Sequence, residues 1–259
     1  MAVELGQPHA GVPGAAFGRI LVNEARVAVR APIGVFLGLA LPLLLLVAFG
    51  RLPKFQVPEP ALGGSTRFDL YVPILLAFAI AAVALWSLPS VLTGYREHGI
   101  LRRLATTPVT PAWLLSAQVL VNLGIAVLSL AILTLGSTRF LGFHASVDPA
   151  GMLVTVVLSL GALFGLGLFI AAVMPSSRAA YFAGAFVFFL SMFFAGMWVP
   201  RASMSSGLAN FGNYTPLSAS VQSLQAALAG TFPPTWALLV LAAYLLVFGA
   251  LAIRMFRWE

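Results

Sequence analysis

The side chains that could carry catalytic or metal chemistry in this sequence are few and widely separated. The chain has no cysteine, and its three histidines, His9, His98 and His144, lie far apart. A metal site or an acid–base pair needs such groups to converge on one point. The sequence contains neither a Gly-x-x-x-x-Gly-Lys-Ser/Thr phosphate loop nor a Gly-x-Ser-x-Gly turn. It therefore predicts no catalytic residue, no metal site and no cofactor on this chain, and hence a protein that is not an enzyme.

The most charged segment is Tyr95–Ala112, with the sequence YREHGILRRLATTPVTPA. A short helix is predicted from about Arg96 to Ala105, because its apolar side chains would then face one way and its charged ones mostly elsewhere. The apolar positions are Ile100, Leu101 and Leu104, and Pro108 and Pro111 would end the helix. The alternative is an ordinary basic loop that only sets membrane topology.

The rest of the chain is unusually apolar. Hydrophobic residues make up 61% of it and charged residues only 8%, whereas a soluble domain has about 25% charged residues. Six stretches approach the roughly 20 apolar residues that cross a bilayer, and none of their interiors contains Asp, Glu, Lys, Arg or His. They are Ile33–Phe49, Leu70–Leu92, Trp113–Leu135, Met152–Val173, Ala180–Val199 and Thr235–Met255.

These stretches predict an all-α polytopic membrane protein with six transmembrane helices. Residues 1–14 are rich in Gly and Pro and are expected to be disordered, and residues 15–259 are expected to form a single domain. The net charge of +7 is scattered through short loops, which favours a topology signal over a nucleic-acid surface. With both termini in the cytoplasm, nine basic residues lie inside and five outside.

Two segments outside the spans have the pattern of amphipathic helices. In Ala15–Ala31 one face carries Arg19, Asn23, Arg26 and Arg30, which predicts a helix in the cytoplasmic membrane interface; a frayed basic tail is the alternative. In the outer segment Pro200–Thr231 the apolar positions recur at helical spacing, with Gly230 as the cap. These positions are Leu217, Val221, Leu224 and Leu228.

The absence of charge inside the spans bears on the energy source. Ion-driven transporters place carboxylates or histidines within the membrane, and this chain has none in its predicted span interiors. If the protein moves something uphill, the energy should enter from a cytoplasmic partner that hydrolyses ATP. The amides Gln118 and Asn122, one turn apart in the third span, are expected to hydrogen-bond to another helix.

With these features in place, the chain resembles the membrane subunit of type-2 ATP-binding-cassette exporters, including antibiotic and multidrug efflux permeases. The similarity runs from about Phe17 to Phe256 and rests on an amphipathic helix leading through Arg30-x-Pro32, the exit Phe193–Pro200 and the outer segment Asn213–Gly230. The family's cytoplasmic signature is matched at Glu97, Gly99, Leu101, Arg103, Leu104, Thr107 and Pro108. One departure is Gln225, where family members often have a basic residue.

The resemblance implies a permease whose loop between the second and third spans couples it to an ATPase. The coupling positions would be Glu97, Gly99, Ile100, Leu101, Arg102, Arg103, Leu104, Thr107 and Pro108. The implied partners are two ATP-binding subunits, which hold ATP and Mg, a second permease subunit, identical or homologous, and a hydrophobic cargo in a bacterial cytoplasmic membrane. No nucleic-acid partner is expected.

The fifth span carries an aromatic stripe at helical spacing that could line the substrate pathway or pack against lipid and neighbouring helices. The stripe consists of Phe182, Phe186, Phe189 and Phe193. Two other functions remain open from the sequence. One is export of a polysaccharide or lipid-linked glycan by the same mechanism, against which the sparse polar lining argues. The other is a non-transport scaffold, which would have no need of the coupling loop.

Overall fold

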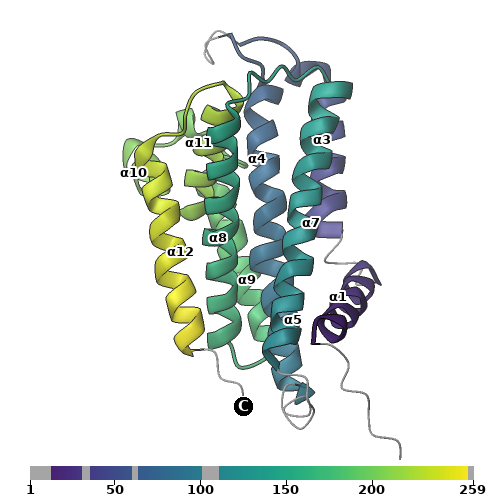
Figure 1. The fold of residues 1–259 in the computed structure, drawn as a ribbon. Helices are drawn as coiled ribbons and strands as arrows, with labels where there is room; N and C mark the ends of the chain where they lie inside the picture. The colour runs from purple at the N-terminus through teal and green to yellow at the C-terminus, as the bar shows by residue number, and fades with distance from the viewer. Residues whose placement is uncertain (1–12, 31–35, 60–63, 101–110, 256–259) are drawn as a thin grey trace, which may run out of the picture.

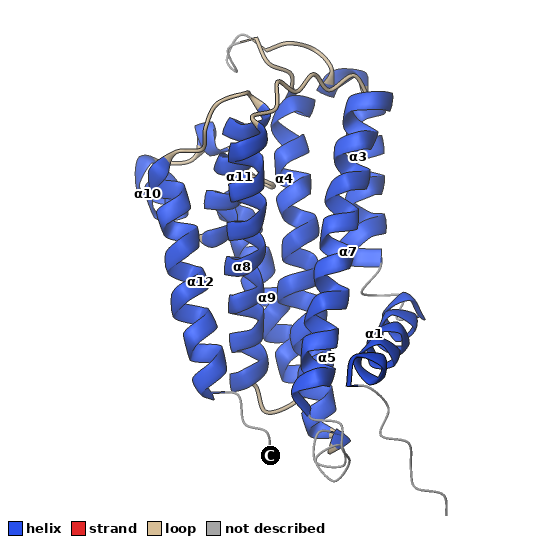
Figure 2. Cartoon of the chain, in the orientation of Figure 1, coloured by secondary structure: helices blue, strands red, loops and turns tan. Residues whose placement is uncertain are grey.

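The computed structural model describes residues 13–30, 36–59, 64–100 and 111–255, and in these ranges the chain is a helical bundle (Figures 1 and 2). The long helices run side by side, and α1 lies across one end of the bundle beside α7. The helices are α1 (Pro13–Arg30), η1 (Phe36–Ala40), α3 (Leu41–Arg51), η2 (Pro53–Phe55), α4 (Arg67–Ala81), η4 (Ala82–Ser87), α5 (Leu88–Glu97), α7 (Pro111–Phe140), α8 (Pro149–Val173), α9 (Ser177–Ala195), η5 (Arg201–Ser203), α10 (Ser206–Asn213), α11 (Pro216–Leu228) and α12 (Thr235–Met255).

The helices confirm the prediction of an all-α polytopic membrane protein. Within the described ranges, five helices are long and apolar enough to cross a membrane, and the stretch Phe36–Arg51 is apolar but shorter. The second span is longer than predicted, because α4, η4 and α5 form one continuous helical stretch from Arg67 to Glu97. The chain is therefore a multi-pass membrane protein with five to six spans.

The second span forms the centre of the bundle. Every residue from Val72 to Leu85 is buried and apolar, because other helices surround this span. Its middle section, η4, is a π-helix, a widened turn that often marks functional sites. Gly167 of α8 and Gly184 of α9 contact the backbone of this section directly. A Cβ atom at either position would lie 1.9 Å from a carbonyl oxygen, that of Ala84 or Leu85 respectively.

Helix α11 is inserted into the bundle between α4, α8, α9 and α12. The predicted apolar stripe is confirmed, and Gly230 follows the helix with φ of +78°. The face opposite the stripe is also enclosed, since Ser218, Ser220 and Ser223 are buried. The helix therefore lies within the protein, where its small side chains allow close packing.

The fifth span ends earlier than the predicted Val199. Helix α9 stops at Ala195 because Gly196 adopts a left-handed conformation with φ of +92°. Arg201 then turns back toward the helix end, where its guanidinium donates to the carbonyl oxygens of Phe194 (2.9 Å) and Ala209 (3.0 Å) and to the side chains of Asn213 and Ser218.

These contacts join the ends of α9 and α10 to α11. A cation near the carbonyl end of a helix is stabilised by the helix dipole. Burial lowers the pKa of Arg201 from its ordinary value, but an arginine still remains charged. Arg201 therefore holds the ends of α9 and α10 against α11 through hydrogen bonds to uncharged oxygen atoms.

Candidate functional site

The candidate site is the exposed end of α5, which leads into the predicted coupling loop. The predicted helix from Arg96 to Ala105 is wrong at its start, because Arg96 and Glu97 form the last turn of the second span. The helix breaks at His98 and Gly99, and Gly99 has φ of +65°, a left-handed conformation that glycine adopts at little cost. Ile100 is the last residue described on this side of the loop. The other coupling positions lie outside the described residues; they are Leu101, Arg102, Arg103, Leu104, Thr107 and Pro108.

Arg96 contacts the carboxyl end of α8. Its guanidinium donates to the carbonyl oxygen of Ala172 at 3.1 Å and also to that of Met174. These carbonyls lie where α8 runs out of intrahelical partners, and the end of a helix carries partial negative charge. Arg96 therefore completes the hydrogen bonding of α8 with a matching charge.

Glu97 contacts the amino end of the next helix. Its carboxylate accepts hydrogen bonds from the backbone N–H of Ser177 at 2.8 Å and from the Ser177 hydroxyl at 2.7 Å. Ser177 is the first residue of α9, where the unpaired N–H groups and the helix dipole favour an anion. Consecutive side chains of α5 thus hold both ends of the short turn between α8 and α9. We call this arrangement the α5 clamp, meaning Arg96, Glu97 and their partners Ala172, Met174 and Ser177.

A second polar cluster connects α1, α5 and α7 at the same end of the bundle. Glu24 of α1 is buried, and its carboxylate accepts hydrogen bonds from the Tyr95 hydroxyl at 2.7 Å and from the Gln118 amide. The Gln118 amide also donates to the Tyr95 oxygen at 2.8 Å. We call these three residues the Glu24 cluster. The expected bonding of Gln118 to another helix is confirmed, whereas Asn122 donates to the backbone of Gln118 in its own helix.

The clamp and the cluster meet at the last turn of α5, where the sequence predicted a role for Glu97 but not the contacts made by Tyr95, Arg96 and Glu24. Tyr95, Arg96 and Glu97 are consecutive, so the last turn of α5 contacts α1, α7, α8 and α9. Glu24 had a visible signal, since it is the single acid in the otherwise basic segment Ala15–Ala31. A lone acid on a basic amphipathic helix is a candidate for a specific protein contact, because charges are rarely buried without partners.

The aromatic stripe of the fifth span lies on the surface of the subunit. Phe182, Phe186 and Phe189 are 64%, 68% and 47% exposed, and Phe193 is half-buried. The ring of Trp86, from η4, lies 5.4 Å from that of Phe189. The exposed rings of the stripe therefore face away from the subunit, and the stripe lies beside the π-helical section η4.

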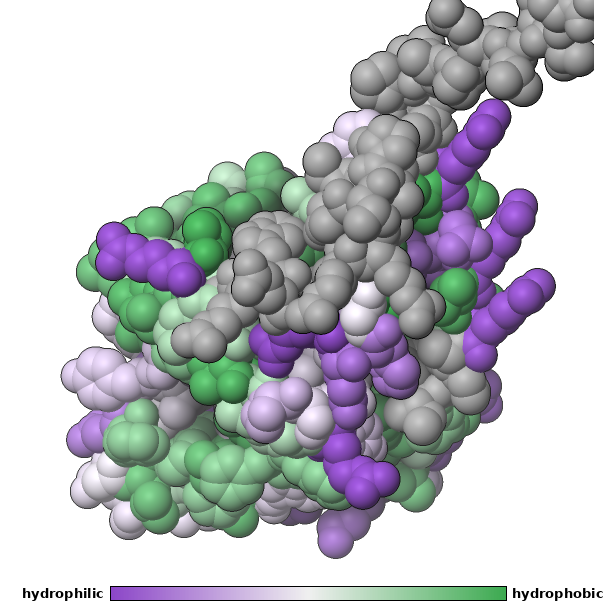
Figure 3. Space-filling model, turned by 90° about the horizontal axis from the view of Figure 1, so that it is seen from below, coloured by the Kyte–Doolittle hydropathy of each residue, from purple (hydrophilic) through white to green (hydrophobic). Residues whose placement is uncertain are grey.

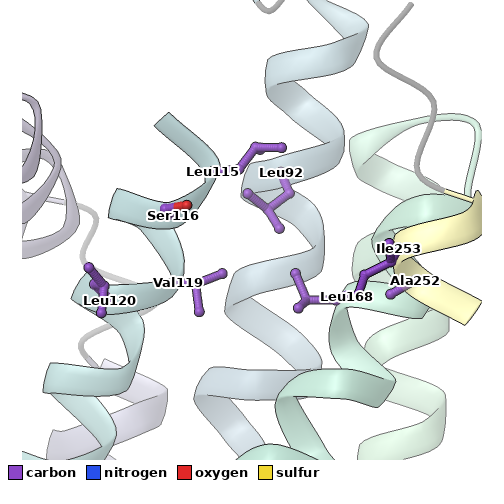
Figure 4. A pocket seen from close by; sticks show the side chains of 8 residues that line it. All are labelled: Leu92, Leu115, Ser116, Val119, Leu120, Leu168, Ala252 and Ile253. Carbon is purple, nitrogen blue, oxygen red and sulfur yellow. The ribbon is translucent and has the colours of Figure 1, made fainter. Parts of the chain in front are cut away.

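An apolar pocket of about 460 Å³ lies near the α1 end of the bundle (Figure 4). Its walls come from α5, α7, α8 and α12, and one hydroxyl, that of Ser116, is the single polar side chain among them. Leu120 and Ile253 at its border are largely exposed, so the pocket opens on the side of the bundle. Such a lining suits an apolar ligand or an acyl chain.

We expect Gly99→Ala to destabilise the turn after α5 by about 1 kcal/mol, because a Cβ atom disfavours the left-handed conformation. No neighbouring atom lies within 4 Å of the Cβ position, so the cost is conformational. Hydrogen exchange of residues 94–100 should rise in this variant. Gly94→Ala is the matched control, because Gly94 lies within α5 with ordinary space around it, and this change should leave exchange unchanged or lower it. Equal exchange in both variants would contradict the prediction.

Comparison with known protein families matches residues 15–229 to the membrane domain described as ABC-2 type transporter. No curated protein matches the chain. The matched range begins within α1 and ends just after α11, so it includes the α5 clamp and the Glu24 cluster. Membrane domains of this type have no nucleotide-binding site and pair with ATP-binding subunits. Because the match covers most of the chain, this protein belongs to the ABC-2 type transporter family as a membrane subunit.

Proposed function

We propose that this chain is the permease of an exporter that moves a hydrophobic or amphipathic, drug-like compound out across a bacterial cytoplasmic membrane. Two ATP-binding subunits, which hold ATP and Mg, dock at the α1 end, and both termini lie in the cytoplasm. The observation that carries the proposal is the α5 clamp. It ties the start of the family's signature loop, at Glu97, to the adjoining ends of α8 and α9.

The clamp gives a physical route for coupling. A force applied to the loop after Gly99 reaches the last turn of α5, and the hydrogen bonds of Arg96 and Glu97 pass it to α8 and α9. Interfaces held by charge-assisted hydrogen bonds tend to move as one body. ATP does work only if it binds one conformation of the complex better than the other. In our proposal, that preference is transmitted through residues 97–108.

The exposed aromatic face of α9 supports the second part of the proposal, a pathway between two subunits. Large exposed apolar surfaces in lipid carry no penalty, but rings that project from one helix can also pack on a partner. We propose that Phe182, Phe186, Phe189 and Phe193 face a second copy or a homologue and contact the cargo. The apolar pocket beside α12 supports a cargo that enters from the lipid phase (Figure 4).

The proposed function is tested by co-purifying the chain with its cognate ATP-binding subunit in lipid nanodiscs. We expect a complex whose ATP turnover rises with apolar cargo candidates, and we expect Gly99→Pro to abolish that rise. Gly207→Pro, in the outer helix α10, is a matched control for a proline placed away from the loop. Coupled turnover that survives Gly99→Pro would refute the coupling role. If glycans but not apolar compounds raise ATP turnover, the cargo is instead a polysaccharide or lipid-linked glycan.

A further inference from the structure

The orientation of α1 about its own axis is fixed by contacts with the bundle. Among the side chains of α1 that the structure describes, Glu24 alone is buried, and it points to α5 and α7 through the Glu24 cluster. Phe17, seven residues earlier and therefore on the same face, packs edge-on against Trp113 with 6.2 Å between the ring centres. The opposite surface of α1 therefore faces away from the bundle.

Two kinds of side chain occupy the surface that faces away from the bundle. Val22 and Val29 are seven residues apart, so they share one face, and they are 50% and 72% exposed. Arg19, Arg26 and Arg30 are exposed on the adjoining face. Since the one acid of α1 is buried, the exposed charge of the described helix is entirely positive. Hydrophilic side chains project from this side of the α1 end (Figure 3).

We propose that α1 binds anionic phospholipids, with the three arginines on the headgroup phosphates and Val22 and Val29 among the upper acyl chains. We call these five residues the lipid face. Lipid binding rests on the proposed function in one respect only, namely that α1 lies at the cytoplasmic leaflet. Arginine forms bidentate hydrogen bonds with phosphate, and basic residues at a membrane surface add affinity for anionic lipid.

The valines favour a membrane over an acidic protein as the occupant. A protein docked on the arginines from the aqueous side would leave Val22 and Val29 in water, whereas a bilayer covers both faces at once. Arg19 and Asn23 also border a cavity of about 450 Å³ between α1 and the ends of α5 and α7, but the carboxyl-bearing Glu24 lines it as well, so this cavity on the bundle side is not part of the lipid face.

The first test measures lipid retention by the full chain without its ATP-binding subunit. The chain is purified from nanodiscs of equal phosphatidylglycerol and phosphatidylcholine, and native mass spectrometry counts the retained lipids. The triple variant Arg19→Gln, Arg26→Gln, Arg30→Gln should lose preference for phosphatidylglycerol by about fivefold per arginine. The matched control removes the same charge at the opposite end through Arg51→Gln, Lys54→Gln and Arg139→Gln, and should lose much less. Equal losses, or no loss in the first variant, would overturn the proposal.

The second test examines the valines with spin labels, which is possible because the chain has no cysteine. A label at Val22→Cys in vesicles containing phosphatidylglycerol should collide mainly with oxygen, and a label at Asn23→Cys mainly with a water-soluble nickel chelate. Identical accessibility at the two positions would overturn the proposal.

A third outcome separates lipid from protein as the occupant of the arginines. If the arginine triple variant loses the ATP-binding subunit while its lipid retention is unchanged, the arginines bind protein and the proposal is overturned. The lipid measurements contain no ATPase, so failure of the coupling proposal leaves their outcome unaffected.

Discussion

Gly184→Ala should strongly reduce the amount of folded protein in the membrane. The added Cβ atom would lie 1.9 Å from the carbonyl oxygen of Leu85 and 3.5 Å from the Cα atom of Trp86. Both atoms belong to the backbone of the π-helical section, so no side chain can rotate away to make room. Overpacking in a filled core costs about 1–3 kcal/mol and sometimes more, and a clash with backbone belongs at the upper end of that range.

The measurement is the thermal unfolding midpoint of the protein in detergent, together with the fraction that elutes as a single species. Gly167→Ala should behave similarly, because its Cβ atom would meet the Ala84 carbonyl oxygen from the α8 side. Gly124→Ala is the control, since nothing lies within 4 Å of its Cβ position and alanine favours the helix. Equal unfolding midpoints for Gly184→Ala and Gly124→Ala would contradict the close contact between Gly184 and the backbone of η4.

Glu97→Ala should lower coupled ATP turnover by about tenfold while the ATP-binding subunit stays bound. The variant removes the carboxylate oxygen that accepts both hydrogen bonds from Ser177, so the amino end of α9 loses its connection with the last turn of α5. The proposed transmission to the fifth span would then fail, although the loop that we propose to bind the ATPase keeps its sequence. Turnover in nanodiscs and the stoichiometry of the purified complex are measured in parallel.

Two further variants separate a positioning role from a direct contact with the ATPase. Glu97→Gln keeps one side-chain oxygen acceptor and should restore part of the turnover. Ser177→Ala removes the hydroxyl donor but keeps the backbone N–H, so it should cause a smaller loss in the same direction. Loss of the ATP-binding subunit in Glu97→Ala would mean that Glu97 contacts that subunit. Unchanged turnover would mean that the clamp carries no coupling.

The sequence predicted the elements whose signals are local. The spans follow from runs of apolar residues, and the stripe of α11 follows from helical spacing. The start of α8 is local in the same way, since Asp148 precedes Pro149 and its carboxylate accepts a hydrogen bond from the N–H of Gly151 at 3.1 Å. Such features depend on neighbours a few residues away.

The remaining features depend on residues distant in the sequence. Glu24 and Gln118 are 94 positions apart, and no local pattern indicates that they meet. The same is true of Glu97 and Ser177. Apolar residues continue past Ala195, so hydropathy predicts a fifth span as far as Val199, whereas the left-handed conformation of Gly196 ends the helix at Ala195. Hydropathy alone therefore overestimates the length of the fifth span, because it does not report the backbone conformation that ends the helix.

The central position of the second span bears on stoichiometry. Its side chains are enclosed by α8, α9, α11 and α7, so the middle of one subunit is solid protein in the described residues. Under the proposed function, the cargo would then move along the outside of the subunit, at the contact between two permease subunits. When wild-type chain is mixed at random with an inactive variant, we expect transport to fall with the square of the wild-type fraction.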